Sequence, residues 1–157
     1  MTFTNSSNLD PAKRRILFLC AGNSARSQMA EGLLRHEADG ACEVFSAGTT
    51  PSSFRQEAIA VMSEAGIDIS DHWSKPVSDF IGQKFDCVIT VCDHAKEFCP
   101  VLPGSTKHLH WSFTDPAAVE GSGEERAVAF RKVRDEIRDR LKAFVAEYGG
   151  SAYRAGA

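Results

Sequence analysis

Two residues near the start of the chain have the types and the spacing for chemistry on an oxyanion. Cys20 and Arg26 lie six positions apart and enclose small and polar residues. In a loop, successive backbone N–H groups can surround an oxyanion, and a helix that begins after the loop adds the positive end of its dipole. Arg26 adds a planar, permanently charged group that binds two oxygens at once. We therefore expect an oxyanion-binding loop made of Ala21, Gly22, Asn23, Ser24, Ala25 and Arg26.

Cys20 immediately precedes this expected loop and is the candidate nucleophile. The positive field of the loop and the helix favours the thiolate form of a cysteine, which is the reactive form. Ser27 follows Arg26, and its hydroxyl can donate a hydrogen bond to that thiolate. In the alternative interpretation, Cys20 is a small buried residue that ends a strand and Arg26 is a surface charge. The place of both residues between an expected strand and an expected helix favours the catalytic loop.

Hydrophobic periodicity predicts the elements that position the loop. The apolar run 16–19 predicts a short buried strand, and residues 24–38 predict a helix with one apolar face. Further strands are expected at 42–46, 85–91 and 107–111, and further helices at 56–65 and 124–148. Strands that alternate with helices, with an oxyanion loop after the first strand, predict an α/β fold in which helices flank a four-stranded parallel sheet.

The expected helix 124–148 carries one apolar stripe on an otherwise charged surface. We expect this stripe to be buried, and it consists of Val128, Phe130, Val133, Ile137, Leu141 and Phe144. Cys42 and Cys87 fall at the start and in the middle of expected strands. They are therefore interpreted as small apolar core residues.

Three candidate groups each follow an expected strand: Cys20, Cys92 and the loop 112–116 with Asp115. In a sheet of parallel strands, ligands bind outside the carboxyl ends of the strands, which meet at one edge. We therefore expect these three groups to lie close together and Asp115 to act as a general acid. Asp115 also precedes Pro116, a common position for a helix or turn cap, so capping is the alternative role.

Cys92 and Cys99 form a second candidate pair of reactive thiols. In one continuous helix, residues seven apart are separated by about 10 Å along the axis. A disulfide requires Cα atoms within about 7 Å of each other. Joining Cys92 to Cys99 therefore requires the segment between them to unwind or loop, which predicts a conformational change coupled to oxidation.

Two other interpretations of these thiols remain open. Cys92, Asp93, His94 and Cys99, with His108 or His110, are residue types that bind zinc, although their spacing is not a usual zinc pattern. Alternatively, the two cysteines are structural and take no part in chemistry.

The composition is that of an ordinary globular protein. The 157 residues are consistent with a flexible leader at 1–12 and one catalytic domain at 13–157. A net charge of −3 gives no general affinity for nucleic acid or for an anionic membrane, and no apolar run is long enough to span a bilayer. The five cysteines are an odd number without an export signal, so we expect free thiols and a cytoplasmic location.

Three segments of the sequence resemble one known group of proteins. CAGNSARSQMAEG resembles the oxyanion loop shared by low-molecular-weight tyrosine phosphatases and the arsenate reductases of that fold. VITVCDHAKEFCPVLPG resembles the redox segment of thioredoxin-coupled arsenate reductases, and HWSFTDPA resembles their general-acid loop. The phosphatases usually have proline where Gln28 stands, commonly have tyrosine where Ala117 stands, and have no pair like Cys92 and Cys99. The likeness extends from about Arg14 to the final helix and implies a three-layer, phosphatase-like sandwich.

The resemblance implies that the protein reduces arsenate to arsenite for arsenic detoxification. Cys20 would attack arsenic held by the loop and Arg26, while Asp115 protonates the departing oxygen. Cys92 and Cys99 would then carry the oxidising equivalents away as disulfides, which thioredoxin reduces. A glutathione- or mycothiol-type reductant is the alternative partner, and a low-molecular-weight tyrosine phosphatase is the alternative function. A zinc- or arsenite-binding thiol protein is the non-enzymatic hypothesis. We expect no bound cofactor and a monomer.

Two positions depart from the pattern of the reductases. Many of them have a further cysteine where Ala25 stands, but that thiol is not part of the relay. Some relatives also bind potassium near the loop, and three residues of this chain match ligand positions: Asn23, Glu31 and Ser46. Lys75 falls where a further carboxylate ligand would be expected, so no metal site is predicted.

Overall fold

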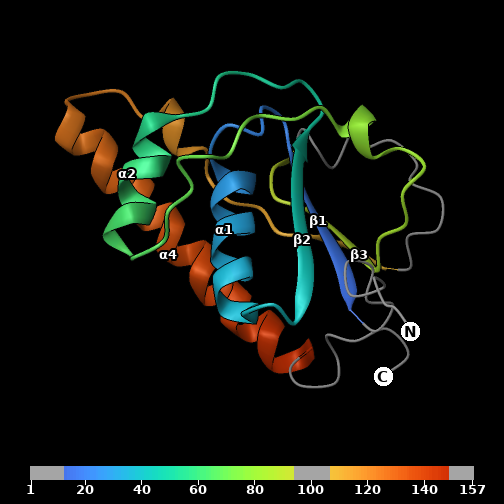
Figure 1. Cartoon of the computed structure of the whole chain (residues 1–157). Coiled ribbons are helices and arrows are strands. Elements are labelled where there is room, and N and C mark those ends of the chain that lie inside the picture. The colour runs from blue at the N-terminus through green and yellow to red at the C-terminus, as the bar shows by residue number, and fades with distance from the viewer. Residues whose placement is uncertain (1–12, 94–106, 149–157) are drawn as a thin grey trace.

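The computed structural model of the chain describes residues 13–93 and 107–148. In the described part of the chain, α-helices follow the first, second and fourth of four strands (Figure 1). The strands are β1 (Arg14–Cys20), β2 (Cys42–Gly48), β3 (Cys87–Thr90) and β4 (Lys107–His110). The helices are α1 (Arg26–Ala38), α2 (Gln56–Glu64) and α4 (Gly123–Tyr148), and two short 3₁₀ turns are η2 (Val77–Phe80) and η3 (Pro116–Ala118). The expected leader 1–12 and Cys99 lie outside the described residues.

The four strands form one parallel sheet in the order β2-β1-β3-β4, which confirms the expected fold class. β1 lies in the interior of the sheet, and its core residues 16–19 are completely buried. The bounds of all four strands differ from the expected ones by one or two residues. β3 is shorter than the apolar run 85–91, and β2 continues past the expected end at residue 46 to Gly48.

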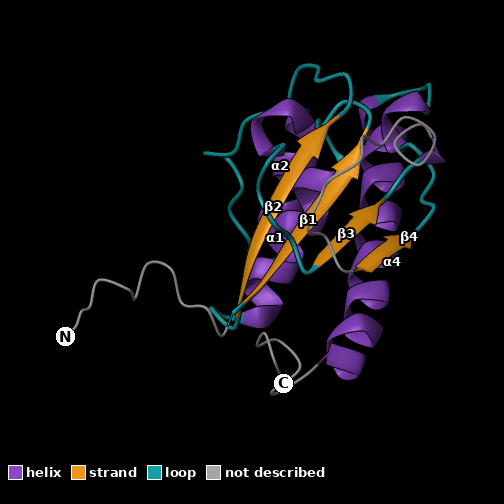
Figure 2. Cartoon of the chain, turned by 90° about the vertical axis from the view of Figure 1, so that its right-hand side faces the viewer, coloured by secondary structure: helices purple, strands orange, loops and turns teal. Residues whose placement is uncertain are grey.

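Helices α1 and α4 cover one face of the sheet, and Figure 2 shows all three α-helices behind it. On this face, Phe18 of β1 packs against Trp111, which in turn packs edge-on against Phe144 of α4. On the other face, Phe45 of β2 contacts Phe80 of η2 and Phe85 edge-to-face. Both faces of the central strands are therefore buried, as the continuous apolar run of β1 requires.

The apolar stripe of α4 is buried at five of its six expected positions. The exception is Val128, which is 54% exposed, so its assignment to the stripe was wrong. Consecutive helical residues are about 100° apart, so Val128 lies about 200° around the axis from Phe130. The buried stripe thus begins at Phe130 and continues at intervals of three and four residues.

Cys42 and Cys87 are buried in the core, in agreement with their interpretation as apolar residues. Burial raises the pKa of each thiol to about 12, so both are protonated at neutral pH. Among the described residues, Cys20, Cys42 and Cys87 carry free thiols. In the part of the chain that is described, no helix has both the length and the apolar character to cross a membrane.

Candidate active site

The expected oxyanion loop lies between the end of β1 and the start of α1, at the predicted place in the fold. Cys20 is the last residue of β1 and is nearly buried, and Arg26 is the first residue of α1. Asn23 adopts a left-handed backbone conformation with φ of 49°. Its backbone N–H donates to the sulfur of Cys20 at 3.2 Å, and the Ser27 hydroxyl lies 3.0 Å from the same sulfur.

The segment after β2 fixes the direction of the loop's peptide groups. The N–H groups of Thr49, Thr50, Ser52 and Arg55 donate to the carbonyls of Cys20, Ala21, Gly22 and Ser24, respectively. Within one peptide group the carbonyl and the following N–H point in opposite directions. Because these carbonyls are bonded to the outer segment, the N–H groups that follow them face the inside of the loop. This is the arrangement that an oxyanion needs.

A cavity of about 300 Å³ lies at this loop. Its walls include Cys20, residues of the loop, Arg26 and Asp115. A second cavity of about 450 Å³ adjoins it and is lined by Cys92 and Asp93 among others. The two cavities share Ala21, Arg26 and Asp115 as lining residues. The three groups that were expected at one edge of the sheet therefore do lie together.

Arg26 joins the oxyanion loop to the loop that carries Asp115. One guanidinium nitrogen donates to the carbonyl of Phe113 at 3.0 Å, and another lies 3.8 Å from Asp115 Oδ2. The other carboxylate oxygen, Oδ1, accepts the N–H of Ala117 and caps η3. Asp115 therefore caps a turn, which was the alternative interpretation. Its Oδ2 also faces Arg26, and both residues line the cavity.

Cys92 follows β3 and is 4% exposed. The next residue, Asp93, accepts a hydrogen bond from His110 Nε2 at 3.0 Å, and His110 Nδ1 contacts the Thr90 hydroxyl at 2.7 Å. Both ring nitrogens of His110 are thus engaged within the protein, which disfavours His110 as a zinc ligand. The other expected zinc residues His94 and Cys99 lie outside the described residues, so the pairing of Cys92 with Cys99 stays a prediction.

A buried polar network behind the loop was only partly anticipated. Gln28 is completely buried, and its amide nitrogen donates to the backbone carbonyl and Oδ1 of Asn23 and to the carbonyl of Trp73. Its amide oxygen bonds His72 Nδ1 at 2.9 Å, and the Ser74 hydroxyl donates to the Asn23 carbonyl. The only sequence signal for these supports was the presence of polar residues in segments otherwise expected to be buried or irregular.

Comparison with known proteins identifies the family. A profile of the family described as low molecular weight phosphotyrosine protein phosphatase matches residues 15–151. The arsenate reductase of Halalkalibacterium halodurans is 45% identical over 132 residues, which cover 84% of this chain and 95% of that protein. This chain belongs to the arsenate reductases of the low-molecular-weight phosphotyrosine protein phosphatase family. The arsenate reductase of Bacillus subtilis is 44% identical over 129 residues, covering 82% of this chain and 93% of that protein.

Solved structures of this family have the same fold. An arsenate reductase in the phosphate binding state superposes with a TM-score of 0.74 at 32% identity and covers 85% of this chain and 98% of its own. The thioredoxin-dependent arsenate reductase of Corynebacterium glutamicum gives a TM-score of 0.66 at 29% identity, covering 90% of this chain and 67% of that one. The family resemblance inferred from the three sequence segments is therefore confirmed.

Proposed function

We propose that this protein reduces arsenate to arsenite with Cys20 as the nucleophile and Cys92 and Cys99 as a disulfide relay. The observation that carries the proposal is the adjacency of the two cavities, one lined by Cys20 and the other by Cys92, with Arg26 in the wall of both. The names of the relatives and the shared fold support arsenate as the substrate. The inward N–H groups of the loop and Arg26 support binding of a tetrahedral oxyanion.

In the first step, the Cys20 thiolate forms a sulfur–arsenic bond, and one arsenate oxygen leaves as water. Asp115 supplies the proton for that oxygen, since its carboxyl group lines the same cavity as Cys20. Arg26 and the backbone N–H groups bind the remaining oxygens, whose charge grows in the transition state. The Ser27 hydroxyl, 3.0 Å from the sulfur, stabilises the thiolate before the attack.

In the second step, the Cys92 thiolate attacks the sulfur of Cys20. The sulfur–arsenic bond breaks, and its electron pair stays on arsenic, which leaves as arsenite. In the third step, Cys99 attacks Cys92, a Cys92–Cys99 disulfide forms, and Cys20 leaves as a thiolate. An external dithiol then reduces the new disulfide by exchange. A thioredoxin is the proposed reductant because one structural relative is named a thioredoxin-dependent arsenate reductase.

The test is arsenate-dependent NADPH consumption in the presence of thioredoxin and thioredoxin reductase. Wild type is expected to turn over, and Cys20→Ser, Cys92→Ser and Cys99→Ser are each expected to abolish turnover. The control is Cys42→Ala, which removes a buried thiol away from the loop and should retain turnover. Glutathione- and mycothiol-coupled assays identify the reductant if thioredoxin does not serve.

The alternative function, phosphotyrosine hydrolysis, uses Cys20 and Arg26 but gives no role to Cys92 or Cys99. Phosphate and arsenate are both tetrahedral oxyanions, so the same loop is expected to hydrolyse p-nitrophenyl phosphate slowly. If wild type hydrolyses this ester but reduces no arsenate with any thiol donor, the reductase proposal is wrong.

The cavity at the loop contains the nucleophile, Arg26 and the proposed acid of a single chain, so the proposed first step needs no second copy and we propose a monomer. Light scattering coupled to gel filtration tests this point. The proposed chemistry requires reduced thiols and a dithiol donor, which supports a cytoplasmic location.

A further inference from the structure

A buried carboxylate lies behind the oxyanion loop and is connected to the nucleophile. Glu31 of α1 is 5% exposed, and its Oε1 accepts the Ser46 hydroxyl at 2.6 Å. The Asn23 amide nitrogen donates to the hydroxyl oxygens of both Ser46 and Ser27, at 3.0 and 2.7 Å. Ser27 in turn lies 3.0 Å from the sulfur of Cys20. An unbroken chain of buried hydrogen bonds therefore joins Glu31 to the nucleophile.

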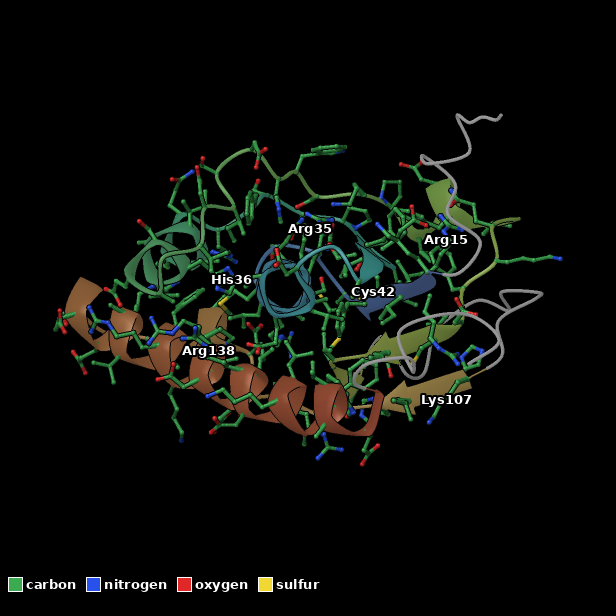
Figure 3. All side chains as sticks on the ribbon, turned by 60° about the horizontal axis from the view of Figure 1, so that its bottom comes forward. Arg15, Arg35, His36, Cys42, Lys107 and Arg138 are labelled. Carbon is green, nitrogen blue, oxygen red and sulfur yellow. The ribbon has the colours of Figure 1, made fainter. Side chains whose placement is uncertain are left out.

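Three basic side chains surround Glu31. Arg35, one helical turn further along α1, bonds Oε2 at 2.6 Å, while Lys75 Nζ and His72 Nε2 each lie 3.9 Å from the carboxylate. In Figure 3, Arg35 lies on the side of α1 that faces away from α4. The side chain of Arg35 is half exposed, whereas that of Lys75 is only 12% exposed. Lys75 is thus the more enclosed of the two cations. Burial lowers the pKa of its ammonium group from the ordinary value, and the neighbouring Glu31 carboxylate opposes that shift.

His72 contributes little positive charge to this cluster. The amide nitrogen of Gln28 is used as a donor, so its oxygen faces His72 and His72 Nδ1 carries the hydrogen. Burial lowers the pKa of His72, so the ring is neutral at pH 7 and presents an unprotonated Nε2 toward Glu31. The charge of the buried carboxylate is therefore balanced by Lys75 and Arg35.

Lys75 also touches the loop through its backbone. Its N–H donates to Asn23 Oδ1 at 2.8 Å, and its carbonyl accepts the N–H of Gly48. Its ammonium group donates to the carbonyl of Trp73 and lies 5.0 Å from the centre of that ring. Backbone and side chain together fix the position of the ammonium group relative to Asn23 and Glu31.

The potassium ion that some relatives bind near the loop does not fit these residues. Asn23 Oδ1 already accepts two N–H groups, from Gln28 and from Lys75. The Ser46 hydroxyl already accepts from Asn23 and donates to Glu31. A metal cation beside Glu31 would also be repelled by the Lys75 ammonium. The oxygens that would bind an ion are therefore occupied, and the charge that would attract it is balanced.

We propose that the Lys75 ammonium is the built-in cation of the oxyanion loop. It balances the buried charge of Glu31 and thereby holds Ser46, Asn23 and Ser27 in the directions that Cys20 requires. Lys75 is a positioning residue, since it acts on the sulfur through this chain. Its presence makes the loop independent of monovalent cations in solution. The proposal rests on Cys20 as the nucleophile of the proposed function, but not on arsenate as the substrate.

The experiment compares wild type, Lys75→Ala and Lys75→Arg in choline, sodium, potassium and methylammonium chloride at equal ionic strength. Three quantities are measured: the rate of Cys20 alkylation by iodoacetamide, the melting temperature and the rate of arsenate reduction. Choline is too large to enter the cluster, whereas potassium and methylammonium can replace the missing ammonium group. Lys142→Ala is the matched control, because Lys142 is an exposed lysine of α4.

Wild type and Lys142→Ala are expected to give the same values in all four salts. Lys75→Ala should alkylate and turn over roughly threefold to tenfold more slowly in choline. Potassium and methylammonium should restore both rates, and Lys75→Arg should retain them without a salt. If Lys75→Ala lost these rates only because it folds less stably, the cations that fit the cluster would not restore them better than the cations that do not.

Two results would overturn the proposal. In the first, the Cys20 alkylation rate or the melting temperature of wild type changes with potassium but not with choline. In the second, Lys75→Ala has the same alkylation and reduction rates as wild type in choline. The wild-type comparison holds even if Lys75→Ala does not fold. If the alkylation pattern is as expected but wild type reduces no arsenate, the proposed function fails while the role of Lys75 stands.

Discussion

At the scale of single residues, the hydrogen bonds around Ser27 determine where its hydroxyl hydrogen points. Its hydroxyl oxygen accepts from Asn23 Nδ2, so its own hydrogen is free to point at the sulfur of Cys20. A hydrogen bond to a charged group contributes about 1.5–3 kcal/mol. Ser27→Ala is therefore expected to slow alkylation of Cys20 by iodoacetamide at neutral pH by about tenfold.

Ser63→Ala provides the control for this measurement, because Ser63 is an exposed serine of α2. Its alkylation rate should equal that of wild type, and phosphate should protect Cys20 in both proteins. Equal rates in Ser27→Ala and wild type would show that Ser27 does not stabilise the thiolate.

The two core cysteines predict a loss of stability in alkali. Burial raises the pKa of Cys42 and Cys87 to about 12, from 9.0 in the unfolded chain. Above pH 9 the unfolded chain therefore releases these protons while the folded protein retains them. The free energy of unfolding should then fall by about 1.4 kcal/mol per pH unit for each thiol, from about pH 9 until the folded protein also titrates near 12.

Urea unfolding under reducing conditions at about pH 8, 9 and 10 measures this slope. Cys42→Ala removes one of the two thiols, so its slope should be shallower by about 1.4 kcal/mol per pH unit above pH 9. Below pH 9 the variant should show the same pH dependence as wild type. Parallel curves above pH 9 would contradict the burial of this thiol in its protonated form.

At the scale of elements, Gly48 connects β2 to the shape of the oxyanion loop. A Cβ at Gly48 would lie 2.5 Å from the carbonyl oxygen of Ala21 and 2.9 Å from the backbone nitrogen of Asn23. Backbone atoms cannot give way as a flexible side chain can, so Gly48→Ala must displace the loop. We expect a destabilisation of about 1–3 kcal/mol and a larger relative loss of activity.

Gly123→Ala is the matched control, because nothing lies within 4 Å of a Cβ built at Gly123. Denaturant unfolding and the rate of arsenate reduction are measured on both variants. If Gly48→Ala loses stability but keeps the wild-type rate, the loop tolerates the displacement and its N–H groups are not as critical as proposed.

The α4 stripe gives a second prediction for an element. Phe130 is completely buried, whereas Val128 is 54% exposed. Phe130→Ala is therefore expected to lower the free energy of unfolding by about 3–5 kcal/mol, while Val128→Ala should change it by less than about 0.5 kcal/mol. Urea unfolding of the two variants checks the difference. A similar cost at both positions would mean that the buried stripe extends to Val128.

Sequence reasoning succeeded where the signal was local. The strand, loop and helix around Cys20 follow from consecutive residues, and the convergence of Cys20, Cys92 and Asp115 follows from the rule for parallel sheets. The exposure of Val128 could also have been predicted, since Val128 lies two positions from Phe130. It was assigned to the stripe because it is apolar and near the stripe in sequence.

The supports of the loop could not be predicted in the same way. Gln28 bonds the carbonyl of Trp73, 45 positions away, and Lys75 approaches Glu31 only because the chain returns past β2. No local sequence pattern predicts contacts between residues so far apart in the chain. The resemblance flagged Lys75 as a departure from a metal site, but only the distances show that its ammonium lies beside the carboxylate.

At the scale of the whole molecule, one arginine connects helices α2 and α4 to the loop that carries Asp115. Arg126 of α4 donates to the carbonyls of Ala117 and Val119, just after Asp115, and pairs with Glu57 of α2. Through Arg126, helices α2 and α4 thereby hold the loop that presents the proposed general acid. General acids contribute about 10²- to 10⁴-fold to rate, and this contribution requires correct placement.

Arg126→Met is therefore expected to lower the turnover number for arsenate by about tenfold while leaving the alkylation rate of Cys20 unchanged. Arg131→Met is the matched control, because Arg131 pairs with Glu64 of α2 but makes no contact with the Asp115 loop among the described residues. It should retain wild-type turnover. An equal loss in both variants would show that the packing of α2 against α4, and not the placement of Asp115, governs the rate. A slower alkylation in Arg126→Met would show instead that the disturbance reaches the oxyanion loop.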